Sequence, residues 1–173
     1  EFPVQEWHSG RVQFVRSSII HLMRGQVYEI EGKRFFTMDG ASSHDIDDGI
    51  LEPDDPKFRQ KCRALNARNA MYRVNHHSWW KEELPCEDEY QTARDNLERC
   101  GWAVDYIITH CCPTSVQEEL GAGVYQADTL TDFLEEIARK CQFKYWFFGH
   151  YHDNGVIWEK FVLLYEQILR LKL

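Results

Sequence analysis

Two short apolar runs in the second half of the chain, each following an amphipathic helix pattern, constrain the fold more than any other feature. Residues Val104–Thr109 and Lys144–Phe148 have the composition of buried strands. A strand, a helix and a second strand in this order form a β-α-β unit, in which the two strands run parallel. We therefore predict an α/β fold. In such folds ligands gather beyond the carboxyl ends of the strands.

Other segments have the periodicities of helices and strands. Residues Glu87–Cys100 form a predicted helix, and another begins at Thr129, where Thr129 and Asp132 match the S/T-x-x-D start pattern. Phe58–Met71 is a third predicted helix. The predicted strands outside the β-α-β unit are Val12–Val15, Ile19–Leu22, Gln26–Ile30, Lys33–Met38 and Phe161–Tyr165. No linker interrupts these segments, so we predict one domain spanning residues 1–173.

The charge balance and the cysteines exclude several classes of protein. The 20 Lys and Arg residues stand against 28 Asp and Glu residues, and this acidic excess argues against a nucleic-acid surface or a basic membrane patch. The apolar runs are too short to span a bilayer. Six cysteines without a C-x-x-C pair indicate reduced thiols and a cytoplasmic protein.

Histidines follow both strands of the β-α-β unit. His110 comes directly after the first strand, and His150 and His152 come after the second. Neutral imidazole is a common ligand of first-row divalent metals, and an H-x-H sequence on a bend can serve two adjacent ions. Gly149, without a Cβ atom, would let the chain turn sharply beside such a site. The sequence therefore predicts a metal site at these strand ends.

The same residues resemble the last two motifs of the calcineurin-like metallophosphoesterases, in particular bacterial members. Thr109, His110 and Pro113 match T-H-x-x-P, and residues 149–152 match G-H-x-H. The resemblance implies two mixed β-sheets packed face to face with flanking helices. It also implies two divalent ions (Mn, Fe or Zn), with His110 and His150 on one ion and His152 on the other. The implied reaction is hydrolysis of a phosphoric mono- or diester.

The D-x-H, G-D-x-x-D and G-N-H-[DE] motifs of that family are not found in the sequence. By resemblance, the chain is thus expected to be the C-terminal portion of such a domain, inactive alone, with the catalytic residue of the upstream motif unassigned. We further expect unpaired sheet surface, and hence association into oligomers, around four apolar residues: Ile107, Ile108, Phe147 and Phe148.

Three further residues are candidates for supporting roles. Asp153 is expected to orient His152, because ligating imidazoles need a partner for the second ring nitrogen. His76 and Trp79 are expected to line a pocket for the phosphate-ester substrate. Two alternatives remain open at this point. One is a metal-deficient, non-enzymatic binding module, and the other is a mononuclear zinc protein that uses the three histidines with or without a cysteine.

Overall fold

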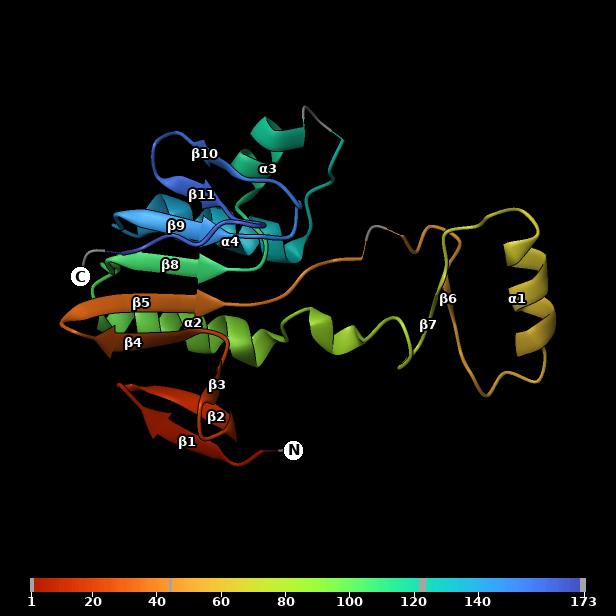
Figure 1. Ribbon diagram of the computed structural model, residues 1–173, viewed down its shortest axis with the longest axis horizontal. Helices are drawn as coiled ribbons and strands as arrows, with labels where there is room; N and C mark the ends of the chain where they lie inside the picture. The colour runs from red at the N-terminus through yellow and green to blue at the C-terminus, as the bar shows by residue number, and fades with distance from the viewer. Residues whose placement is uncertain (1, 44, 122–123, 172–173) are drawn as a thin grey trace. The chain divides into compact units, whose positions relative to one another are not determined.

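A six-stranded mixed sheet organises the larger part of the molecule (Figure 1). The computed structural model describes residues 2–43, 45–121 and 124–171. The order of strands across this sheet is β10-β11-β9-β8-β5-β4. The strands, in chain order, are β4 (Gln26–Ile30), β5 (Lys33–Met38), β8 (Tyr106–Thr109), β9 (Tyr145–Phe148), β10 (Gly155–Ile157) and β11 (Phe161–Leu163). The four inner strands are parallel and the two outer strands are antiparallel to their neighbours. The predicted α/β class with a parallel β-α-β unit is confirmed.

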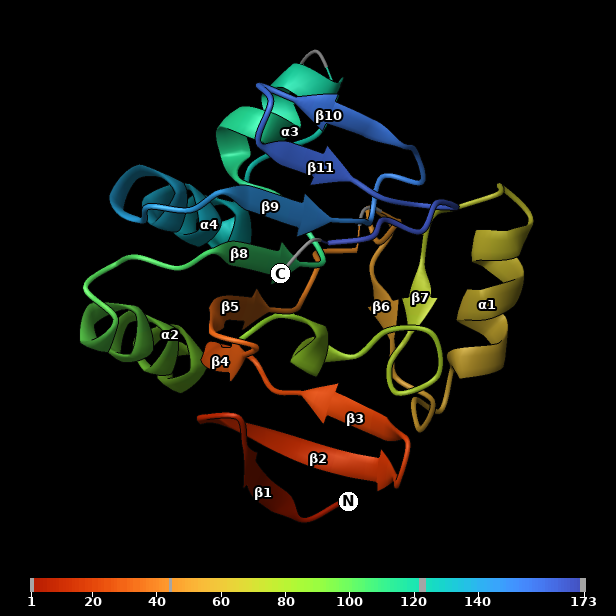
Figure 2. The same ribbon diagram turned by 60° about the vertical axis from the view of Figure 1, so that its left-hand side comes forward.

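Three helices belong with this sheet, and α2 and α4 lie on one side of it in Figure 2. They are α2 (Glu87–Arg99), α3 (Thr114–Gly121) and α4 (Thr129–Lys140). Their apolar stripes and the residues on one face of the sheet form a single buried cluster that includes Leu97, Ile107 and Trp146. The α4 helix begins at Thr129 as predicted, but its N-cap is Asp128, one residue before the start of the S/T-x-x-D pattern. The Asp128 carboxylate accepts the Thr131 N–H at 2.8 Å, and the Thr131 hydroxyl accepts the Asp128 N–H at 2.9 Å.

A three-stranded antiparallel sheet packs on the opposite face of the larger sheet. Its strands are β1 (Val4–Trp7), β2 (Gly10–Arg16) and β3 (Ile19–Leu22). Val12 of β2 is fully buried in a second cluster with Tyr28 of β4 and with Tyr106 of β8. The Tyr28 hydroxyl donates to the Arg11 carbonyl at 2.6 Å and accepts the Met23 N–H at 2.9 Å. Tyr28 thus joins the two sheets by both packing and hydrogen bonds.

Our expectation of unpaired strand edges in the β-α-β unit is wrong. Strands β8 and β9 are inner strands, paired on both sides. Ile107, Phe147 and Phe148 are buried, because alternate residues of a strand enter opposite clusters of the core. Ile108 is 39% exposed, on the face that the smaller sheet covers in part. Sheet edges at these residues therefore offer no basis for association.

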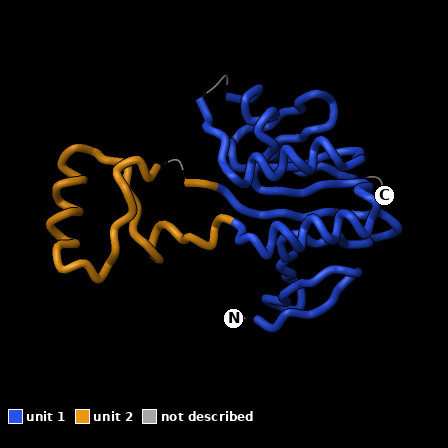
Figure 3. Tube along the Cα trace, turned by 180° about the vertical axis from the view of Figure 1, so that it is seen from behind, with its two compact units in different colours: residues 1–41, 85–173 blue, residues 42–84 orange. Residues whose placement is uncertain are grey.

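Residues 42–84 form a separate unit, shown in orange in Figure 3. It contains two short parallel strands, the helix α1 and one turn of 3-10 helix. They are β6 (Ile50–Leu51), α1 (Phe58–Asn66), β7 (Arg73–Val74) and η1 (Lys81–Glu83). The α1 helix ends five residues before the predicted end at Met71. Backbone and carboxylate bonds between Met71 and Asp48 hold the following segment in an extended path instead.

Each of the two units has most of its contacts within itself. Whether both belong to one domain is not tested by this division, so the single domain over residues 1–173 stays a prediction. All six cysteines are free thiols. None of the helices in the described ranges has the length and apolarity needed to traverse a lipid bilayer.

Candidate functional site

The two histidine-bearing loops of the larger unit leave adjacent parallel strands. Ile107 of β8 pairs with Trp146 of β9, so both strands end at the same edge of the sheet. Beyond the strands, the Gly149 N–H donates to the His110 carbonyl at 3.1 Å. This backbone hydrogen bond fixes the two loops side by side, as the parallel pairing predicts.

The side chains of His110 and His150 are in contact with each other. Nδ1 of His150 lies 3.2 Å from Nε2 of His110, and the ring centroids are 5.1 Å apart with an angle of 69° between the rings. His110 is exposed and His150 is half-buried. The structure therefore brings together two of the three histidines predicted as metal ligands, at one exposed place.

His152 is directed elsewhere. Its ring stacks on the ring of Tyr165, with the centroids 5.0 Å apart and the planes at 24°. The Asp153 carboxylate, expected to orient His152, accepts the backbone N–H of Asn154 at 2.7 Å. In residues 2–43, 45–121 and 124–171 no group of three or more His, Cys, Asp or Glu side chains is placed to hold a metal ion. The assignment of His152 as a ligand stays a prediction.

The loop conformation differs from the one expected for Gly149. The left-handed residues of this loop are His150, with φ of 70°, and His152, with φ of 51°, while Gly149 is not left-handed. A Cβ atom at position 149 would lie 3.5 Å from the Leu164 carbonyl oxygen, an ordinary contact. The left-handed region costs a residue other than glycine roughly 1–3 kcal/mol, so the surrounding structure must hold both histidines there.

The spacing of the two facing nitrogens allows a test of whether these residues fit a divalent ion. Two imidazoles on one ion, with metal–nitrogen bonds of about 2.0–2.1 Å, place their nitrogens roughly 3.0–3.4 Å apart. The observed 3.2 Å between His110 and His150 falls in this range. The pair thus fits two coordination positions of one ion, and a complete site needs further ligands.

A cavity opens beside His110 at the ends of β5 and β8. It has a volume of about 250 Å³ and is lined by Leu22, Thr37, Met38, Asp39, Ile108, Thr109 and His110. At its rim, the Arg24 guanidinium lies 3.9 Å from the Asp39 carboxylate. The lining combines apolar walls with a few polar groups, and the volume is below the roughly 300–1,000 Å³ that is usual for ligand sites.

Buried hydrogen bonds hold the His110 loop from behind. The indole Nε1–H of Trp146 donates to the Thr109 hydroxyl at 2.7 Å, and this hydroxyl donates to the Cys111 carbonyl at 2.5 Å. Cys111 and Cys112 are buried, and burial raises the pKa of the Cys112 thiol to about 12 and that of Cys111 further. Both cysteines are part of the buried core cluster directly behind His110.

A second network, which the sequence did not predict, holds the His150 loop. Tyr151 turns inward and its hydroxyl reaches Gln117 of α3, a helix that we did not expect at Thr114–Gly121. The T-x-x-Q pattern from Thr114 to Gln117 directly after Pro113 was an available signal for the start of this helix. No sequence pattern distinguishes Tyr151 as an anchor, because that role depends on α3.

The two remaining predicted site residues belong to the unit of residues 42–84. The backbone N–H of His76 donates to the carbonyl of Trp79 at 2.8 Å, closing a short loop. His76 has a φ of 55° and an exposed side chain, and Trp79 is half-buried. Their role in lining a substrate pocket stays a prediction.

Comparisons with known proteins add no assignment. No family model, no curated protein and no solved structure matches the chain. The class that the structure establishes is an α/β protein, in which one mixed sheet has helices on one face and an antiparallel sheet, where a second mixed sheet was expected, on the other.

Proposed function

We propose that this chain supplies histidine ligands to a divalent-metal site that hydrolyses phosphoric mono- or diesters. The observation that carries the proposal is the 3.2 Å separation between Nδ1 of His150 and Nε2 of His110, at the carboxyl ends of adjacent parallel strands. The resemblance of both loops to the last two metallophosphoesterase motifs gives the reaction class. The finer fold type, a metallophosphoesterase sandwich, is part of the same proposal.

In this proposal, His110 and His150 hold one divalent ion (Mn, Fe or Zn), and His152 contributes to a second. Ions bound there would lower the pKa of a water molecule and neutralise charge on a phosphoryl group. This local positive charge would let a protein with a net charge of −8 accept an anionic substrate. The residues of the chain itself orient the imidazoles and shape the cavity beside His110.

Metal binding is the first test. The parent chain, His110→Ala and His150→Ala are titrated with Zn²⁺ and Mn²⁺ in equilibrium dialysis, with His21→Ala as a matched control whose ring bonds to Gln13. We expect each site variant to lose at least tenfold in affinity and the control to equal the parent. Equal affinity in all four proteins would reject the site.

Activity is the second test, and it uses the polypeptide as its gene encodes it. p-Nitrophenyl phosphate and bis(p-nitrophenyl) phosphate are supplied with Mn²⁺, Fe²⁺ or Zn²⁺. We expect hydrolysis of at least one ester, and loss of most turnover in the His150→Ala and His152→Ala variants with the circular dichroism spectrum retained. Absence of hydrolysis with all three metals would reject the enzymatic proposal. The 173-residue chain alone is expected to be inactive.

A second candidate function is that of a mononuclear zinc protein without catalysis. It is favoured by one observation, namely that the His152 ring stacks on Tyr165 at 5.0 Å between centroids, while His110 and His150 face each other at 3.2 Å as a pair suited to one ion. A stoichiometry of one Zn²⁺ per chain, unaffected by Mn²⁺ and without ester hydrolysis, would identify this alternative.

A further inference from the structure

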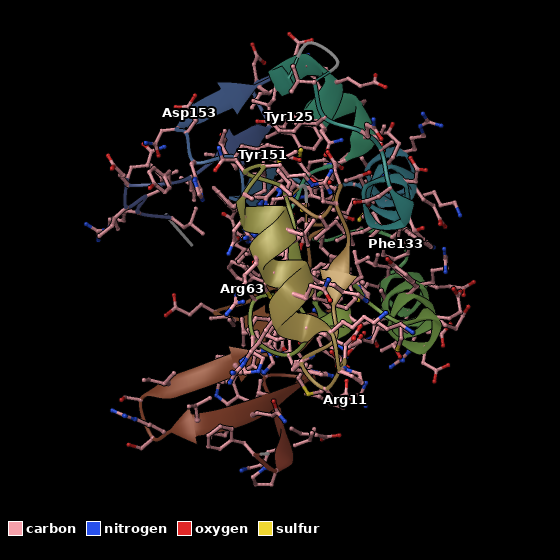
Figure 4. The ribbon with its side chains drawn as sticks, turned by 90° about the vertical axis from the view of Figure 1, so that its right-hand side faces the viewer. Arg11, Arg63, Tyr125, Phe133, Tyr151 and Asp153 are labelled. Carbon is pink, nitrogen blue, oxygen red and sulfur yellow. The ribbon has the colours of Figure 1, made fainter. Side chains whose placement is uncertain are left out.

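Tyr151 lies between the two histidines of the H-x-H sequence, and its half-buried side chain packs against the hydrophobic core. Its ring contacts the rings of Tyr125 at 5.0 Å and Phe148 at 6.0 Å between centroids, and it contacts the His150 ring edge-on at 5.1 Å. Figure 4 labels Tyr125 and Tyr151, which lie next to each other. One residue of the exposed loop is thereby anchored against the core.

The Tyr151 hydroxyl connects three segments of the site. It donates to Oε1 of Gln117 at 2.9 Å, and it accepts from Sγ of Cys112 at 3.3 Å. Cys112 belongs to the loop that carries His110, and Gln117 belongs to α3. The Gln117 side chain is itself fixed, because this residue is only 2% exposed and its Nε2 donates to the Gln126 carbonyl at 3.0 Å.

This anchor accounts for how the loop keeps an unfavourable backbone. His150 and His152, on either side of Tyr151, are both left-handed, a conformation that must be held by interactions elsewhere. The Tyr151 hydroxyl is hydrogen-bonded to both the His110 loop and α3. It therefore fixes the position of the neighbouring His150 backbone relative to His110. The hydroxyl makes its hydrogen bonds to Gln117 and Cys112 and not to an imidazole. It therefore affects the positions of the imidazoles through the backbone of the loop.

We propose that Tyr151 is a positioning residue, whose hydroxyl sets the approach of His150 to His110 and thereby the geometry of their metal site. This inference rests on one part of the proposed function, namely that His110 and His150 bind a metal ion. It adds a half-buried residue, packed against the core, to a site that the motifs define only by its histidines.

The test compares Tyr151→Phe with the double variant Tyr151→Phe/Gln117→Leu. The single variant removes one oxygen and leaves Oε1 of the buried Gln117 without its donor, which also costs stability. The double variant removes both polar partners. It also loses the bond from Gln117 to the exposed residue Gln126, so it is expected to regain part of the lost thermal stability. The readouts are Co²⁺ affinity from visible absorption, and the ¹⁵N chemical shifts of the imidazoles in the metal-free protein at constant pH. His8, whose Nδ1 lies 2.9 Å from the Glu29 carbonyl oxygen, is the reference imidazole.

We expect Tyr151→Phe to lower Co²⁺ affinity about tenfold, the size typical for residues that orient metal ligands. The shifts of His110 and His150 change while those of His8 do not, and the double variant recovers part of the stability without recovering affinity. Parent-like affinity and shifts in Tyr151→Phe, or recovery of affinity together with stability, would overturn the proposal. A parent chain that binds no Co²⁺ would instead count against the proposed function, and the imidazole shifts alone would then decide the role of Tyr151.

Discussion

The indole Nε1–H of Trp146 donates a 2.7 Å hydrogen bond to the hydroxyl of Thr109, the residue directly before His110. Both residues are buried, on adjacent parallel strands. The hydroxyl in turn donates to the Cys111 carbonyl, on the other side of His110. One polar side chain therefore satisfies a buried donor of the core and braces the backbone on both sides of a candidate metal ligand.

Replacing Thr109 by Val keeps the shape of the side chain and removes the hydroxyl. The Trp146 N–H is then buried without an acceptor, and we expect the free energy of unfolding to fall by about 1–3 kcal/mol. Urea denaturation followed by Trp fluorescence measures the change. Thr109→Ser, which retains the hydroxyl, is the control and should lose less. Equal midpoints for the parent and Thr109→Val would contradict the prediction.

Gly10 of β2 lies close to the ring of Tyr28, a residue of the larger sheet. A Cβ atom at this position would lie 2.5 Å from a ring carbon of Tyr28, a residue that is fully buried and held by two hydrogen bonds. We expect Gly10→Ala to destabilise the protein by about 1–3 kcal/mol, the range for overpacked sites. Gly155→Ala is the matched control, since a Cβ atom there meets nothing within 4 Å. Similar melting temperatures for the two variants would contradict the prediction, because they would show that the sheets shift to accommodate the methyl group without loss of stability.

An ion pair between Arg94 of α2 and Glu136 of α4 should make the free energy of unfolding depend on pH. Hydrogen bonding from Arg94, at 2.9 Å, lowers the pKa of Glu136 below its ordinary value of 4.5. A carboxyl with a lowered folded-state pKa stabilises the protein above its unfolded-state pKa, and this contribution is lost as the pH falls through the folded-state pKa. Glu136→Gln should therefore be less stable than the parent at pH 7 by about 0.5–1 kcal/mol, a value that allows for solvent screening.

The measurement is denaturation of the parent and of Glu136→Gln at pH 7 and at pH 3. We expect the difference in unfolding free energy to shrink at pH 3. Glu98→Gln is the control, because it removes the same charge from an exposed α2 position. A difference that stays constant between the two pH values would assign the effect to packing.

The thiols should differ in reactivity according to burial. Cys86 is exposed, whereas Cys111 and Cys112 are 3% and 0% exposed. Burial also raises the pKa of the Cys112 thiol to about 12, so almost no thiolate is present there at pH 8. Iodoacetamide at pH 8, with peptide mass spectrometry, should label Cys86 first and leave Cys111 and Cys112 unlabelled until denaturant is added. Early labelling of Cys112 would show that the loop after His110 opens in the native state.

Local patterns were sufficient where a segment's structure follows from its own residues. The strands Gln26–Ile30 and Lys33–Met38 and the helix over Glu87–Arg99 agree with the patterns of their apolar residues. The strand ends that carry His110 and His150 were also predictable, because consecutive strands of a β-α-β unit lie parallel and expose their carboxyl ends together.

Other features depend on partners that are distant in the sequence. The α1 helix ends at Asn66 because Asp48 binds the segment after it, and Met71 alone gives no sign of this. Ile107 is buried in the cluster formed with the helices, and Phe147 is buried in the cluster formed with the smaller sheet. Their apolar character did not reveal which face of the sheet each one occupies.

For the candidate site, the sequence by itself determined the kind of ligand and its place at the strand ends. Only the tertiary structure decided which histidines meet. The ring of His152 stacks on Tyr165, while the Gly149–His110 backbone bond and the inward turn of Tyr151 bring His150 to His110. The motif spacing fixes how far apart residues lie along the chain. The direction of each side chain, however, depends on backbone angles that are set by residues such as Gln117, 33 positions away from His150 in the sequence.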